Sequence, residues 1–461
     1  MRVHRIKASM QRNRRILLLC TFYDHLLIRG RMWLKTPNFT CLKFTRLYIM
    51  SSIDIKTKMT QTRIALLVIC HIAIARAIGQ EQQTHAKWWQ RYDVLVVGAG
   101  LSGAVLAERH AAQGDRVLVI DKRPHIAGNC YDYVDEPTGI RVSKYGAHLF
   151  HTNIARVWRY VQQFADWRRW DHTVLAYVDG QHVPVPVNVN TVNQMFNASL
   201  RDTGEMDAFL SQLQVKYESA PANSEEMAKS RVGEVLYDKI FGPYTRKQWN
   251  RPPAELAPEV TGRIPVRNDF DNRYFTDRYQ ALPVQGYTEF VANLLHGADV
   301  LLGVDYFDLN NTSSFKGVTY YTGPIDRFFG QGEQLEYRSL QFERVAVMNH
   351  VGTVQPVSVI NYPSADYEYT RIIEYKHFLR QQSPHTVLFR EYPSDMGEPY
   401  YPIPSKRNMD LYESLRMRAG DIPNVIFVGR LASYKYINMD QAIDDALSVF
   451  ERDGQRLKIE F

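Results

Sequence analysis

The sequence contains few cysteines and few long apolar runs. Three of its four cysteines, Cys20, Cys41 and Cys70, precede residue 91, so the rest of the 461-residue chain holds only Cys130 and cannot form an internal disulfide. The most apolar run, residues 64–75, is too short to predict a membrane span. A hydrophobic content of 45% with 23% charged residues excludes disordered, collagen-like and polytopic membrane proteins. These limits leave a globular protein of more than one domain.

Acidic residues are nearly absent from the first 91 residues, which contain 17 Lys and Arg but only 3 Asp and Glu. Because the net charge of the whole chain is +7, the remainder is acidic, which argues against nucleic acid as its partner. Residues 59–77 have the basic, apolar and small-residue order of a secretory signal or membrane anchor, with translated upstream sequence as the alternative. We therefore expect residues 1–90 to be a basic leader that is disordered or serves as a signal or anchor.

The first ordered pattern is a β-α-β unit. Residues 93–97 form a continuous apolar run, residues 104–109 have the composition of a helix, and residues 116–120 form a second apolar run that ends at Asp121. Parallel strands that are buried on both faces have such uninterrupted runs. The unit therefore predicts the start of a doubly wound α/β domain.

Three glycines between the first strand and the helix give this unit a chemical role. Gly98 permits a tight turn, Gly100 lets the backbone approach a pyrophosphate, and Gly103 allows the helix to pack closely. The N-terminus of the helix directs free N–H groups at phosphate, and Asp121 is placed to accept hydrogen bonds from a ribose. A dinucleotide is the predicted ligand, and a glycine turn without a nucleotide is the alternative.

Two further segments favour FAD over NAD. Residues 121–129 continue past the acidic residue with basic side chains and a Gly-Asn turn, whose backbone donors suit an additional pyrophosphate contact. Residues 425–430 predict another buried strand ending in glycine, and residues 440–447 predict a helix after it. The positive end of that helix would stabilise an anionic reduced flavin. We therefore expect the C-terminal segment to return to the N-terminal cofactor fold.

The periodicity changes between these two ends. Apolar residues recur at helical spacing over residues 191–239, whereas residues 301–321 and 339–360 alternate like strands. The predicted fold class is α/β, with an FAD-binding Rossmann-like (doubly wound) domain, an inserted helical domain and an antiparallel β-sheet substrate domain. The predicted boundaries are 91–175 and 415–450 for the discontinuous FAD-binding frame, 176–260 for the helical domain, and 261–414 for the β-sheet substrate-binding domain with parts of the FAD frame.

The densest polar and aromatic segments lie in the middle of the chain, at residues 242–249, 263–267 and 271–275. Their guanidinium groups can bind a diphosphate in a bidentate manner, and their aromatic faces can stack on a base or a sugar. These segments suit a sugar nucleotide. The alternative, that the aromatic residues are core and the arginines are solvated, stays open on composition alone.

Eight motifs that follow one another within residues 92–449 resemble the bacterial-type UDP-galactopyranose mutase family. They are KYGAHLFHT (144–152), YTRKQW (244–249), RIPVR (263–267), YQALPV (279–284), YTGPID (321–326), LEYRSL (335–340), YTRIIE (369–374) and EPYYP (398–402). Residues 1–90 have no counterpart in that family.

The resemblance implies a flavin-dependent isomerase that interconverts UDP-galactopyranose and UDP-galactofuranose and supplies galactofuranose for cell-surface glycans. The implied cofactor is FAD in its reduced form, whose N5 forms a covalent adduct with the sugar without net redox change. The expected partners are UDP-galactose, UDP-galactofuranose and NAD(P)H or another reductant. No metal is expected, and a homo-oligomer is left open. We expect a cytoplasmic location, because UDP-sugar pools are cytosolic, unless residues 59–77 act as a signal or anchor.

The resemblance also implies roles for individual residues. Arg263 and Arg371 would grip the diphosphate, and His148 would lie beside the flavin, so these three are the expected catalytic residues. The expected substrate-binding residues carry phenol, hydroxyl, indole or amide groups: Tyr244, Thr245, Trp249, Tyr274, Asn361, Tyr401 and Tyr436. The residues expected to bind FAD are Gly98, Gly100, Leu101, Ser102, Gly103, Asp121, Asn129, Arg430 and Met439.

Three positions depart from the pattern of the family. Asp121 stands in place of a Glu at the ribose and keeps its pair of acceptor oxygens. Ala127 stands in place of a glycine in the pyrophosphate turn, so its backbone is expected to keep a negative φ or to accept strain. Asn438 stands in place of an Asp and removes a negative charge beside the diphosphate.

Two other functions could use the same cofactor frame. A flavin amine oxidase-like oxidoreductase would need an aromatic cage and an apolar tunnel in place of the Arg- and Tyr-rich segments. A binding protein similar to Rab GDP dissociation inhibitor would have lost the flavin, and the intact glycines together with Asp121 argue against that loss.

Overall fold

The computed structural model describes residues 91–309, 315–330, 332 and 334–457. The chain divides into two units, and all the described residues belong to the second, Glu81–Phe461. The signal or anchor expected at residues 59–77 lies outside the described residues. Within the part that is described, no helix is both long enough and apolar enough to cross a membrane.

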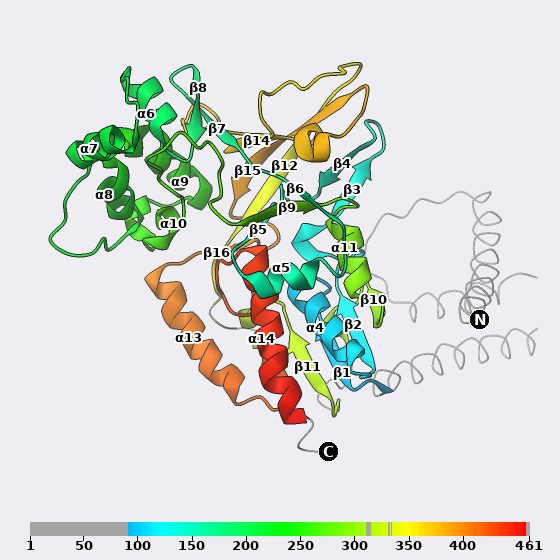
Figure 1. Ribbon diagram of the computed structural model, residues 1–461. Coiled ribbons are helices and arrows are strands. Elements are labelled where there is room, and N and C mark those ends of the chain that lie inside the picture. The colour runs from blue at the N-terminus through cyan, green and yellow to red at the C-terminus, as the bar shows by residue number, and fades with distance from the viewer. Residues whose placement is uncertain (1–90, 310–314, 331, 333, 458–461) are drawn as a thin grey trace, which may run out of the picture. The chain divides into compact units, whose positions relative to one another are not determined.

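A five-stranded parallel sheet forms the frame of this unit. Its order, β10-β2-β1-β11-β17, places β1 in the middle, as in dinucleotide-binding sheets. Helix α4 links β1 to β2, and the C-terminal helix α14 packs against α4 (Figure 1). The predicted α/β, doubly wound fold class is confirmed. The bounds are β1 Val94–Val97, α4 Leu101–Ala112, β2 Val117–Asp121, β10 Asp299–Leu302, β11 Val318–Tyr321, β17 Val425–Phe427 and α14 Met439–Leu457.

A seven-stranded sheet forms the second layer. Its order is β16-β12-β15-β14-β13-β7-β8, and every pair is antiparallel except β13 with β7. The register sets Asn361 opposite Arg371 and Arg371 opposite Glu391, so three polar side chains share one row across the sheet. The bounds are β7 Val174–Val178, β8 Gln181–Val185, β12 Tyr337–Val347, β13 Val359–Asn361, β14 Arg371–Glu374, β15 Thr386–Ser394 and β16 Tyr401–Pro402.

The helical segment, green in Figure 1, lies beside β7 and β8. It begins after residue 185, later than the boundary at 176 expected from the sequence, because residues 174–185 form a hairpin whose alternate valines are buried. A π-helical turn, Tyr237–Phe241, joins α8 to α9. The bounds are α6 Val189–Phe196, α7 Thr203–Leu213, α8 Ser224–Leu236, α9 Gly242–Trp249 and α10 Glu259–Gly262.

Smaller elements complete the described unit. Strands β5, β9 and β6 form a three-stranded antiparallel sheet, and β3 pairs with β4. One buried apolar cluster runs through both large sheets and the helical segment, so these parts share a core. The bounds are β3 Asp132–Asp135, β4 Ile140–Ser143, β5 Phe150–Thr152, α5 Ala155–Val161, β6 Trp167–Arg169, β9 Tyr279–Pro283, α11 Tyr287–Leu294, α12 Ile325–Phe328 and α13 Lys406–Gly420.

Candidate active site

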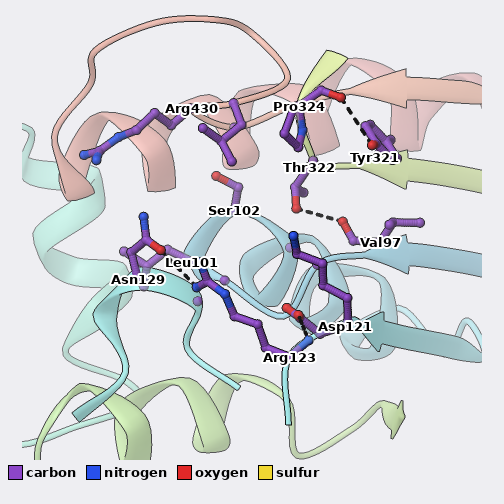
Figure 2. A pocket seen from close by; sticks show the side chains of 18 of the residues that line it. Val97, Leu101, Ser102, Asp121, Arg123, Asn129, Tyr321, Thr322, Pro324 and Arg430 are labelled. Atoms are coloured by element: carbon purple, nitrogen blue, oxygen red, sulfur yellow. Dashed lines mark hydrogen bonds between the residues drawn. The ribbon is translucent and has the colours of Figure 1, made fainter. Parts of the chain in front are cut away.

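A glycine-rich cavity lies at the carboxyl ends of β1 and β2 and at the start of α4. Figure 2 shows side chains from separate segments, among them Ser102, Asp121, Asn129 and Thr322, arranged around it. Every residue that the family resemblance assigns to FAD lines this cavity: Gly98, Gly100, Leu101, Ser102, Gly103, Asp121, Asn129, Arg430 and Met439.

The glycine turn leaves room for a pyrophosphate. Gly98 has a φ of +110°, and a Cβ on Gly103 would lie 2.0 Å from the Gly98 carbonyl oxygen, so the turn and the packing of α4 both need glycine. A Cβ on Gly100 would meet only Gly128 Cα, at an ordinary contact distance of 3.8 Å, so no atom of the chain crowds Gly100. Within the described chain no side chain caps α4, which leaves the N–H groups of its first turn available to an anion. These residues fit a dinucleotide.

Ala127 takes the second of the two conformations expected for it. Its φ is +69°, in the left-handed region, and the next residue, Gly128, follows with +54°. A side chain in this region costs about 1–2 kcal/mol. The Ala127 N–H donates to the Ala99 carbonyl oxygen at 2.9 Å, and the residue is 1% exposed, so a hydrogen bond and packing oppose the strain.

Asp121 shapes the glycine turn as well as facing the cavity. Its Oδ2 accepts from the Ala99 N–H at 2.8 Å and its Oδ1 accepts from the Arg123 N–H at 2.8 Å. The Arg123 side chain was not singled out from the sequence, yet it also lines the cavity. It donates to Asn129 Oδ1 at 2.9 Å and pairs with Glu398. Its position, two residues after Asp121, was the sequence signal that could have identified Arg123.

An arginine-lined cavity adjoins the first. His148, Arg430, Asn438 and Met439 line both cavities and therefore mark their junction. Parts of the remaining wall come from residues 145–151, strands β7 and β8, α9, the segment after α10, and strands β13 and β14. Eight residues predicted for catalysis or substrate binding line it besides His148: Arg263, Arg371, Tyr244, Thr245, Tyr274, Asn361, Tyr401 and Tyr436.

Trp249 does not line this cavity. It is buried with Leu256 and Ile403, and its ring lies 6.4 Å from the ring of Tyr401 and 5.7 Å from that of Tyr436. Trp249 therefore packs behind two tyrosines that do line the cavity. Tyr244 and Thr245 of the motif YTRKQW line the cavity, whereas the turn of α9 directs its last residue into the core.

The two arginines are held in different ways. Arg371 Nη2 lies 2.9 Å from Glu391 Oε1, and Glu391 is completely buried. Although burial opposes the charge, the Glu391 carboxylate raises the pKa of Arg371. The Arg263 guanidinium instead stacks 4.1 Å above the ring of Tyr436, and among the described residues no carboxylate pairs with it. Glu391 was not predicted from the sequence. An acidic residue within a largely buried strand, β15, was the signal that could have identified it.

His148 is neutral at physiological pH. Burial lowers its pKa to about 4, with the nearby positive charges of Arg430 and Arg371 acting in the same direction. Its Nδ1 lies 2.8 Å from the Gly146 carbonyl oxygen, which can only accept, so Nδ1 carries the proton and Nε2 is an acceptor.

Three phenols of the arginine-lined cavity stay protonated. Burial raises the pKa of Tyr244, Tyr274 and Tyr401, so each hydroxyl can donate a hydrogen bond at neutral pH. Among the described residues, no group of three or more His, Cys, Asp and Glu side chains could hold a metal ion. The arrangement is suited to binding an anion through arginines and phenols.

Comparisons with known proteins agree with this arrangement. A family model described as UDP-galactopyranose mutase matches residues 239–436, and one described as an NAD(P)-binding Rossmann-like domain matches residues 96–164. The chain is 37% identical over 360 residues to a Klebsiella pneumoniae protein named "Probable UDP-galactopyranose mutase", covering 77% of this chain and 93% of the relative. It is 34% identical over 370 residues to a dTDP-fucopyranose mutase of Escherichia coli, covering 77% of this chain and 96% of the relative.

Solved structures show the same fold. A crystal structure of reduced UDP-galactopyranose mutase matches with a TM-score of 0.61 and 16% identity, covering 79% of this chain and 96% of that one. A crystal structure titled "Putative protoporphyrinogen oxidase", from Exiguobacterium, matches with a TM-score of 0.56 and 13% identity, covering 79% of this chain and 98% of that one. At this identity they support the fold alone, whereas the curated relatives identify the family. The chain belongs to the UDP-galactopyranose mutase family and is an isomerase.

Proposed function

We propose that this enzyme interconverts UDP-galactopyranose and UDP-galactofuranose with reduced FAD as its cofactor. The observation that carries the proposal is the junction of two cavities at His148 and Asn438. One cavity has a cradle that fits a dinucleotide, and the other has two guanidinium groups. A cofactor and a sugar nucleotide held in adjoining cavities can react with each other.

The chemistry divides between the cofactor and the side chains. When bound and reduced in the glycine-rich cavity, FAD would supply a nucleophile for the anomeric carbon of the sugar. Arg263 and Arg371 bind the diphosphate and stabilise the charge that UDP gains as it leaves. UDP stays between these side chains and returns to the reclosed sugar, so the reaction loses no atoms and causes no net oxidation.

Other residues orient the substrate and handle protons. The hydroxyls of Tyr244, Tyr274 and Tyr401 donate to phosphate oxygens, because burial keeps them protonated. The Nδ1–H of His148 donates to the Gly146 carbonyl oxygen. Nε2 is therefore free to accept a proton or a hydrogen bond at the junction. Helix α14 begins beside this junction, and its N-terminus favours a negative charge there.

The charge of the cavity disfavours a flavin amine oxidase. Arg263 and Arg371 would repel a protonated amine, whereas they attract a diphosphate. A second candidate is the same isomerisation on a dTDP-6-deoxy sugar, because the relative from Escherichia coli is a dTDP-fucopyranose mutase with 34% identity. The product would serve cell-surface glycans, and we place the enzyme in the cytosol with NAD(P)H or another reductant.

The proposal is tested by turnover of UDP-galactofuranose. We expect the purified protein to show flavin absorbance, to be inactive in air, and to form UDP-galactopyranose after addition of dithionite or NAD(P)H. Reductant should not be consumed in proportion to product, because the reaction causes no net oxidation. dTDP-fucofuranose, assayed in parallel by chromatography, decides between the two substrates. Equal activity with oxidised flavin, or product formed only as reductant is consumed, would refute the mechanism.

A further inference from the structure

A half-buried ammonium group binds four backbone carbonyls next to the active site. Lys247, on α9, donates from Nζ to the carbonyl oxygens of Tyr362, Ser364, Tyr367 and Tyr369 at 2.6, 2.8, 2.7 and 3.0 Å. Burial lowers its pKa to about 8, so it remains charged at neutral pH. Within the described chain no carboxylate lies within ion-pair distance of it. The backbone carbonyls therefore take the place of water around the charge.

The four carbonyls belong to one turn, residues 362–370, which joins β13 to β14. The residues at its two ends, Asn361 and Arg371, face each other in the strand register and line the arginine-lined cavity. The Tyr362 N–H donates to the Thr370 carbonyl at 2.8 Å, which closes the base of the turn. The carbonyl dipoles inside the turn point at a single ammonium group, so removing that group would leave them repelling one another.

The backbone of Lys247 lies on α9, a second element that lines the same cavity. Tyr244 and Thr245 precede Lys247 on α9 and line the cavity. Lys247 is thus the side chain that fastens α9 to the turn between Asn361 and Arg371. A displacement of one wall relative to the other would separate the phenol of Tyr244 from the guanidinium of Arg371.

We propose that Lys247 is a positioning residue, which sets the separation of the two cavity walls and thereby the geometry in which they grip the diphosphate. The inference rests on the proposed function, because it takes the anion in the cavity to be the diphosphate of UDP. Groups that bind a rigid anion together lose affinity when their spacing changes, even if each one is present. Lys247 acts on the substrate without touching it.

A second lysine provides a matched control. Lys376 donates from Nζ to four carbonyl oxygens, those of His350, Val351, Gly352 and Ser383, and it is 5% exposed. None of these residues lines either cavity. Loss of either ammonium leaves four carbonyls without their donor, so both losses should reduce stability, but only Lys247 holds the walls of the active site.

The experiment compares Lys247→Met with Lys376→Met in the full-length, flavin-loaded protein. UDP affinity is measured by isothermal titration, and stability by thermal unfolding. We expect both variants to melt at a lower temperature and to keep their flavin. The Kd for UDP should rise about tenfold in Lys247→Met and should stay at the wild-type value in Lys376→Met. Equal Kd values in the two variants would overturn the proposal, because the effect would then follow stability alone.

Lys247→Arg keeps the test decisive if Lys247→Met fails to fold. Arginine retains the charge, but its planar fork cannot present one centre to four carbonyls. We expect this variant to fold with a UDP Kd between those of the wild type and Lys247→Met. If Lys247→Met does not fold and Lys247→Arg binds UDP with the wild-type Kd, the proposal is also overturned. If the wild type itself binds no UDP, the proposed function fails, which is a different result from a variant that binds as the wild type does.

Discussion

Arg263 and Arg371 line one cavity but depend on different surroundings. Arg371 is paired across the sheet with Glu391, a carboxylate that no solvent reaches. Removal of one partner from a buried pair leaves an uncompensated charge, which costs more than the pair contributes. Arg263 rests on the face of Tyr436 and has no such partner in the described chain. The two side chains should therefore differ in how much the fold depends on them.

We predict that Arg263→Ala and Arg371→Ala both abolish turnover and UDP binding while FAD stays bound. Only Arg371→Ala should also lose stability, by about 3–5 kcal/mol, because Glu391 remains buried without a partner. Titration with UDP, denaturant unfolding and flavin absorbance measure the three properties. The mechanism assigns both residues to the diphosphate, so loss of flavin in both variants would contradict it.

A double variant serves as the control. Arg371→Ala combined with Glu391→Gln removes the unpaired charge, so it should recover most of the stability but none of the UDP binding. If the double variant is as unstable as Arg371→Ala, then the cost comes from lost packing and not from the carboxylate.

Single residues also mark what the sequence could not predict. The motif YTRIIE contains Arg371, and the family resemblance assigned Asn361 to the substrate. Glu391 lies in the middle of an apolar strand, and its partner becomes visible only when the register of β14 and β15 is known. Trp249 was placed beside the cavity because its neighbours in the motif are there, but whether a helical residue faces a cavity or the core depends on the next layer of packing.

At the scale of elements, continuous apolar runs predicted the parallel strands β1, β2 and β17. β1 and β2 are buried on both faces, so their sequences contain nothing but apolar side chains up to the functional Asp121. The hairpin of β7 and β8 was assigned partly to the helical domain, because its short strands precede a long helical pattern. The partners of β10 and β11 could not be read from the sequence either, since both join a sheet whose central strand lies about 200 residues earlier.

The start of α14 joins the two cavities. Asn438 lines both, its carbonyl accepts from the Ala442 N–H at 3.0 Å, and its N–H donates to Gln441 Oε1 at 2.9 Å. The residue is therefore at the N-cap position of the helix, where a carboxylate would favour the helix dipole. The same carboxylate would repel a diphosphate. Two electrostatic effects of opposite sign meet at this side chain.

We predict that Asn438→Asp weakens UDP binding by about fivefold at low ionic strength, because the new carboxylate repels the diphosphate by about 1 kcal/mol. The penalty should shrink when salt is added, since part of the interaction is screened. UDP titrations at two salt concentrations measure the effect, with Asn438→Ala as a control that removes the amide without adding charge. Equal dissociation constants together with a raised melting temperature would mean that the helix dipole dominates.

At the scale of the whole molecule, both cavities lie within one unit of the chain. The cofactor sheet takes strands from residues 94–121, 299–321 and 425–427, and the seven-stranded sheet fills the intervals. The two sheets share one apolar core, so the cofactor cradle and Arg371, on β14, keep a fixed relation. Every residue that the proposed mechanism uses belongs to the unit Glu81–Phe461.

We predict that deletion of Met1–Lys87 leaves a folded, yellow and active enzyme, because β1 starts only at Val94 and both cavities are lined by later residues. Its melting temperature, flavin content and turnover of UDP-galactofuranose should match those of the full-length protein. A deletion extended through Ala99 is the control. It removes β1, the central strand that pairs with both β2 and β11, together with Gly98 of the phosphate turn, so it should be colourless and insoluble. If the shorter deletion is also colourless, residues 1–87 contribute to folding or to cofactor binding, and a mechanism confined to the second unit is incomplete.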